Sequence, residues 1–107
     1  MLSIPPPESR LAPALDGLHV SADEWRLDTT RYAAFVELVT GIRPTEHLNA
    51  ADCYRIGNRL EAFVEERKRE GEWNAALVAD LPDVESLEEV IALARFFRHC
   101  HDCRLEQ

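Results

Sequence analysis

A chain of 107 residues is long enough for one compact domain and too short for two. Its formal charge of -8, from 20 acidic and 12 basic residues, repels nucleic-acid phosphates and anionic membrane surfaces and favours a protein partner with a basic surface. The N-terminal residues do not resemble a signal peptide, and no apolar run approaches the ~18 residues of a membrane helix, so we expect a cytoplasmic protein that does not enter membranes.

The N-terminal segment contains three consecutive prolines, Pro5, Pro6 and Pro7. Proline fixes φ and lacks a backbone donor, so the run favours an extended polyproline conformation. We therefore predict a flexible Pro-rich arm over residues 1–9, with a docking motif for a proline-binding groove as the alternative. Residues 10–107 are predicted to form a single helical domain.

A first helix is predicted to begin at Ser21. The run Ser21-Ala22-Asp23-Glu24 matches a capping box, in which the serine oxygen and the glutamate carboxylate each bond an N–H of the first turn. Residues 28–30 are poor helix formers, so the segment is either one helix or a turn followed by a shorter helix. Gly41 is suited to a left-handed C-cap. The apolar residues at helical spacing are Trp25, Tyr32, Phe35, Val36 and Val39.

The second helix is the clearest element of the sequence. Asn49 is placed to cap it, and Gly71 to end it. Gly57 lies inside the apolar stripe, where glycine costs about 1 kcal/mol relative to alanine. Its presence there predicts the close approach of a neighbouring helix. The stripe consists of Cys53, Ile56, Gly57, Leu60, Phe63 and Val64.

The last helix is predicted to follow a second capping box, Ser86-Leu87-Glu88-Glu89. Its apolar residues form a wide arc, which indicates a central helix packed on more than one side. If Leu93 and Phe96 were exposed instead, they would form the seam of a homodimer. The segment 73–81 before it reads either as a helix or as an extended run. The fold class predicted from these elements is all-α, a small bundle of three to four helices.

Five consecutive residues at 99–103 can each bind a metal or carry a proton. The Cys100-x2-Cys103 spacing allows both thiolates to bind one zinc ion, with His99 and His101 beside them. His47 or Cys53 could supply a further ligand if the second helix began nearby. A second Cys pair is absent, so we favour an ordinary helix terminus and no cofactor, with structural zinc as the alternative. A redox dithiol is disfavoured, since the C-terminal end of a helix dipole opposes a thiolate.

Two other kinds of activity find little support in the sequence. Arg55 and Arg59 lie one helical turn apart, as in a DNA-recognition helix, but glutamates are interleaved with them. DNA binding is therefore the third hypothesis. The chain has no nucleophile elbow, dinucleotide-binding motif or phosphate-binding loop, and we expect it not to be an enzyme.

Acidic charge is concentrated between residues 70 and 89, where no basic residue occurs. An acidic segment with an aromatic anchor suits a basic groove, because charge speeds encounter and the aromatic ring adds affinity. The alternative is a solvated acidic surface with Trp73 buried in the core. Our leading hypothesis is a small protein-binding module of the immunity-protein, antitoxin or inhibitor kind. Its predicted contact face comprises Glu72, Trp73, Asp80, Asp83 and Glu85.

Overall fold

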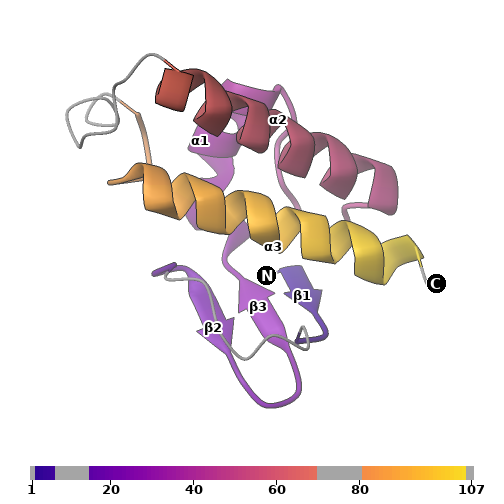
Figure 1. Ribbon diagram of the computed structural model, residues 1–107. Coiled ribbons are helices and arrows are strands. Elements are labelled where there is room, and N and C mark those ends of the chain that lie inside the picture. Colours follow the sequence, from indigo (N-terminus) through magenta and orange to yellow (C-terminus); the bar gives the residue numbers. More distant parts are fainter. Residues whose placement is uncertain (1, 7–14, 70–80, 106–107) are drawn as a thin grey trace.

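The computed structural model describes residues 2–6, 15–69 and 81–105 of the chain. In those ranges the elements are β1 (Leu2–Ile4), β2 (Leu18–Val20), β3 (Trp25–Leu27), α1 (Thr29–Thr40), α2 (Ala50–Arg69) and α3 (Leu87–Leu105). Figure 1 shows α2 and α3 side by side and antiparallel, with the small sheet on the opposite side of α3 from α2. The predicted all-α class is therefore wrong, and the fold is a mostly helical mixture of α and β structure.

The three strands form an antiparallel sheet in the order β1-β3-β2. Leu2 lies opposite Leu27, which in turn lies opposite Leu18. Side chains alternate across the sheet, so Leu2 and Leu27 are fully buried while Ser3 between the buried positions of β1 is exposed. The predicted flexible arm is consequently wrong for residues 2–4, and residues 7–9 of that arm lie outside the described ranges. Three residues are too few for a periodic pattern to reveal a strand.

Ser21 and Glu24 belong to the β2–β3 hairpin turn, not to a helix N-terminus. The serine Oγ accepts the Glu24 N–H at 3.1 Å, which is the hydrogen bond expected in a capping box. The Ser21 N–H, however, donates to the Glu24 carbonyl at 3.0 Å and closes the hairpin. Trp25 therefore begins β3, and its burial follows from the period of a strand. The same local bond fits both structures, so it could not distinguish them.

Helix α1 begins only at Thr29, so it is shorter than a single helix starting at Ser21 would be. Asp28 is its N-cap and accepts the backbone N–H groups of Thr30 and Arg31. The predicted C-cap is confirmed: Gly41 has φ 76° and its N–H donates to the Glu37 carbonyl at 2.8 Å.

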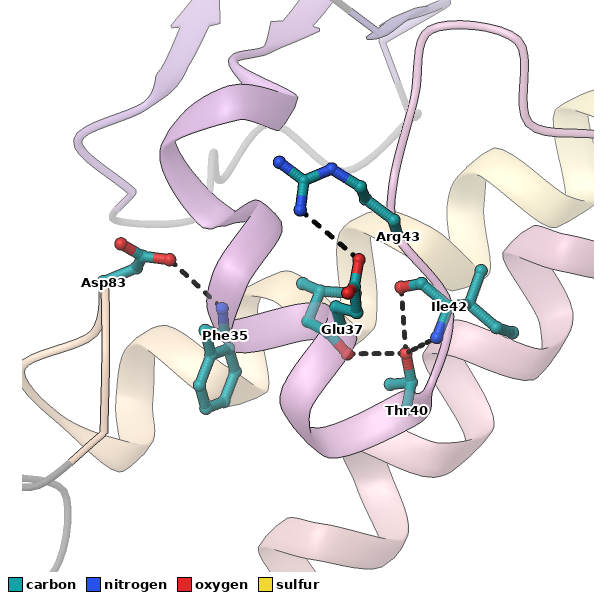
Figure 2. A network of polar contacts seen from close by, with 7 residues as sticks. Phe35, Glu37, Thr40, Ile42, Arg43 and Asp83 are labelled. Carbon is teal, nitrogen blue, oxygen red and sulfur yellow. Dashed lines mark hydrogen bonds and ion pairs between the residues drawn. The ribbon is translucent and has the colours of Figure 1, made fainter.

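The chain leaving α1 is held by side-chain contacts, most of which are drawn in Figure 2. The Thr40 hydroxyl donates to the Val36 carbonyl at 2.6 Å and accepts the Ile42 N–H at 3.1 Å. Arg59 of α2 donates to the carbonyl of Thr40, which places a positive charge at the negative end of the α1 dipole. These contacts fix the direction in which the chain approaches α2.

The long helices α2 and α3 form the centre of the core. The predicted cap of α2 is confirmed, since Asn49 Oδ1 accepts the Asp52 N–H at 2.8 Å. Ser86 Oγ accepts the Glu89 N–H at 3.3 Å at the start of α3, as expected for its capping box. Leu93 and Phe96 are fully buried, so the condition for the predicted homodimer seam is not met. The segment that was predicted as a helix or an extended run falls largely on residues 70–80, outside the described part of the chain.

Gly57 permits the close approach of α2 and α3, as predicted. A Cβ atom added there would lie 3.1 Å from Arg98 Cγ and 3.4 Å from the Arg98 backbone nitrogen. A leucine at this position would have to displace the α3 backbone. We expect Gly57→Leu to lower the free energy of unfolding by about 2–3 kcal/mol, measured by urea denaturation.

The exposed neighbour of Gly57 provides the matched control. Asn58→Leu adds a similar side chain to the solvent face of α2, and its effect should stay within about 0.5 kcal/mol. Equal stability of the two variants would show that the helices do not need glycine at this contact.

Candidate thiol and imidazole site at the ends of α2 and α3

Helix α3 continues through the Cys/His cluster and ends at Leu105. The residues of the cluster therefore occupy its last turns. Helical rotation distributes them among different neighbours: Cys100 contacts Cys53 of α2, His101 contacts Ala50, and His99 contacts Pro5. Asp102 is exposed. Adjacent positions in the sequence thus serve separate contacts.

The main feature of the site is a buried pair of thiols. Cys53 Sγ lies 2.9 Å from Cys100 Sγ, and both residues are fully buried free cysteines. The hydrogen bond from the Cys53 thiol lowers the pKa of Cys100; burial opposes this shift and the positive charge of Arg104 assists it. The same hydrogen bond, together with burial, raises the pKa of Cys53. The thiol hydrogen bond and the positive charge of Arg104 therefore both favour a thiolate at Cys100.

Arg104 lies one helical turn beyond Cys100. Its Nε is buried and has no hydrogen-bond partner among the described residues. An unsatisfied buried donor costs about 1–3 kcal/mol. A thiolate at Cys100 would be stabilised by this charged donor, so the local environment favours a negative charge at that sulfur.

The two histidines connect the end of α3 to neighbouring elements. His99 Nε2 donates to the Pro5 carbonyl at 2.8 Å, and the ring packs edge-on against Trp25 of β3. His101 Nδ1 donates to the Ala50 carbonyl at 2.9 Å, where α2 begins. The ring of Tyr54 lies 5.3 Å from the His101 ring, measured between centroids. Each imidazole therefore holds the end of α3 against another segment of the chain through a backbone carbonyl.

The predicted zinc ligands do not converge in this structure. Cys100 faces Cys53, whereas Cys103 Sγ lies 3.5 Å from His99 Nε2. His47 is exposed, with its ring 3.7 Å from Glu46. Within residues 2–6, 15–69 and 81–105, no group of three or more His, Cys, Asp or Glu side chains is arranged to hold a metal ion. Structural zinc stays a prediction, which the metal content of the purified protein tests.

Only part of the predicted acidic contact face is described, since Glu72, Trp73 and Asp80 lie outside the described ranges. Asp83 and Glu85 are exposed in the turn before α3. Asp83 has φ 69°, and its carboxylate accepts the Phe35 N–H of α1 at 3.1 Å, as Figure 2 shows. Glu85 donates its N–H to the Glu89 carboxylate at 3.0 Å. Hydrogen bonds therefore hold this turn in place at both Asp83 and Glu85.

The arginines suggested for DNA binding are used within the fold. Arg55 lies 3.7 Å from Asp52, and Arg59 holds the C-terminus of α1. Their face is thus occupied by internal contacts as well as by interleaved glutamates.

Sequence reasoning considered Cys53 near the cluster only as a further metal ligand, and it did not anticipate the pair with Cys100. Both cysteines occupy buried positions on apolar stripes, at opposite ends of their helices. An antiparallel arrangement of these helices would have brought them together. Arg104, four residues after Cys100, could also have been recognised from helical spacing.

Comparison with protein-family models gives no match to this chain, and neither the curated proteins nor the solved structures give one. In the described ranges, none of the helices combines the length and apolar character needed to cross a membrane. The function is therefore inferred from the residues of the chain itself.

Proposed function

We propose that the protein is a non-enzymatic module that binds a protein with a basic surface through the acidic turn preceding α3. The observation that carries this proposal is that the turn before α3 and the first turn of α3 are anchored and present acidic side chains to solvent. Asp83, Glu85 and Glu88 are all exposed. Within the described residues, neither Asp83 nor Glu85 forms an ion pair, so their charges are available to a partner.

The anchoring of the turn supports binding for an entropic reason. Val84 is buried between the two exposed acidic residues, and Asp83 is tied to α1 through the Phe35 N–H. A contact surface that is already ordered loses less conformational entropy when it binds. Three further acidic residues, Glu70, Glu72 and Asp80, precede the turn in the sequence and add to its negative charge. Immunity proteins, antitoxins and small inhibitors use acidic surfaces in this way, which is the class to which we assign the protein by analogy.

Charge reversal in this turn tests the proposal. The double variant Glu85→Lys, Glu88→Lys should reduce recovery of the bound protein at least tenfold, because each lysine replaces an attraction by a repulsion. The measurement is quantitative mass spectrometry of proteins that the immobilised chain retains from a lysate of its source cells, at two salt concentrations. Circular dichroism shows whether the variant is folded.

A second double variant, Asp23→Lys, Glu66→Lys, is the matched control. It changes the net charge by the same amount at exposed positions in the β2–β3 turn and on α2. The proposal requires that this control retain the partner and that added salt weaken binding. Equal loss from both variants would indicate nonspecific attraction, and equal retention by both would place the contact face elsewhere.

A further inference from the structure

We propose that Cys53 and Cys100 are a site of reversible oxidation, at which a peroxide or a low-molecular-weight disulfide converts the two thiols into a disulfide between α2 and α3. This inference is independent of the proposed binding function. It rests on the position of the two sulfur atoms, on the groups around them and on the separate placement of the third cysteine.

The two sulfur atoms are already in contact across the helix interface. Their separation is 2.9 Å, and a covalent bond of about 2.05 Å needs them to approach by less than about 1 Å. The two side chains meet in a buried contact, and the helices that carry them are antiparallel (Figure 1). Bond formation therefore requires local adjustment and no rearrangement of the fold.

The surroundings assign different roles to the two thiols. Cys100 lies one helical turn before Arg104, whose positive charge stabilises a thiolate at that sulfur, so Cys100 is the nucleophile. With hydrogen peroxide, the Cys100 sulfur attacks one oxygen, the O–O bond breaks, and hydroxide takes up a proton to leave as water. Cys53 then attacks the resulting sulfenic acid, the S–O bond breaks, and a second water carries away the Cys53 proton. Two thiols are oxidised and one peroxide is reduced to two waters.

A low-molecular-weight disulfide gives the same product by exchange. The Cys100 thiolate attacks one sulfur of that disulfide and expels the other as a thiolate. Cys53, losing its proton, then displaces the remaining small thiol and closes the protein disulfide. An excess of a small dithiol reduces the disulfide formed by either route to two thiols and is itself oxidised to a cyclic disulfide, so the modification is reversible.

Access to the buried pair is through the ends of the two helices. Cys53 lies in the first turn of α2 and Cys100 near the end of α3, where helices open most readily. The His101–Ala50 hydrogen bond and the adjacent Tyr54 ring close this end of the interface. Opening these contacts exposes the thiols without unfolding the centre of the core.

Cys103 does not share this arrangement. It contacts His99 on the side of α3 that meets Pro5 and β3. We therefore expect selective pairing of Cys53 with Cys100, and a Cys103 that keeps its thiol in the oxidised protein.

The test is oxidation of the folded, chelator-treated full chain, with its zinc content measured beforehand. After treatment with hydrogen peroxide or oxidised glutathione, the number of thiols titrated in denaturant should fall from three per chain to one. Peptide mapping should identify a Cys53–Cys100 link that dithiothreitol removes. Because the bond closes a long loop, the melting temperature should rise by roughly 10 °C.

Two single variants make the result specific. Cys103→Ser should still form the disulfide and lose both remaining thiols, whereas Cys53→Ser, in which Cys100 has no partner thiol, should form no disulfide between α2 and α3. If Cys53→Ser does not fold, Cys53→Ala replaces it. Peptide mapping of the oxidised chain without substitutions identifies the linked cysteines in either case. Three titratable thiols after oxidation, or a mapped link that includes Cys103, would overturn the proposal.

Discussion

Replacing Phe96 with alanine should lower the free energy of unfolding by about 3–5 kcal/mol. Phe96 is fully buried near the middle of α3, and its ring packs edge-on against Phe97 with centroids 5.5 Å apart. The substitution removes the apolar contacts of the ring and leaves a cavity that neighbouring side chains can fill only in part. Domains of this size are stable by about 5–15 kcal/mol, so a large share of the total stability would be lost.

Urea denaturation followed by circular dichroism provides the measurement for this prediction. Arg95→Ala is the matched control, because Arg95 is the exposed neighbour of Phe96 on the same helix. Its effect should stay within about 0.5 kcal/mol. A loss of less than about 1 kcal/mol for Phe96→Ala would contradict the central position of α3 in the core.

Replacing Leu2 with aspartate should cost about 3–6 kcal/mol, the second of the large effects. Leu2 is fully buried in β1, opposite Leu27, and an unpaired carboxylate cannot remain at that position. The strand would detach from the sheet, which limits the cost to the burial of Leu2 and Ile4, at about 1.5–3 kcal/mol for each side chain.

A substitution at the neighbouring residue, Ser3, distinguishes a paired strand from a flexible arm. Ser3 points to the exposed face of the same strand, so Ser3→Asp should change stability by less than about 0.5 kcal/mol. Thermal melting of the two variants would show the difference directly. If Leu2→Asp melted at the same temperature as Ser3→Asp, the N-terminal residues would behave as the arm that the prolines suggested.

The elements that could be predicted from the sequence are those whose signals lie within one or two helical turns. The Asn49 and Ser86 caps, the Gly41 C-cap and the apolar stripes of α2 and α3 each involve residues at most a few positions apart. Gly57 also carried a correct prediction, because glycine inside an apolar stripe has few explanations other than close packing.

The strands could not be predicted in the same way. Each has three residues, and β1 pairs with a strand more than twenty positions later in the sequence. The Ser21–Glu24 run was misleading because one hydrogen bond, from the Glu24 N–H to the Ser21 hydroxyl, occurs in both a capping box and this hairpin turn. Only the pairing of Trp25 with Ile4 and Val20 decided between them.

The sequence by itself determined the N-terminal caps and apolar stripes of the long helices, the acidic character of residues 70–89 and the presence of reactive side chains near the C-terminus. The tertiary structure decided which of those side chains meet. Cys100 and Cys103 are close in sequence, yet Cys100 pairs with Cys53, 47 positions away, because α2 and α3 are antiparallel. Local patterns record contacts along one helix, whereas chemistry between helices depends on how their buried faces pack together.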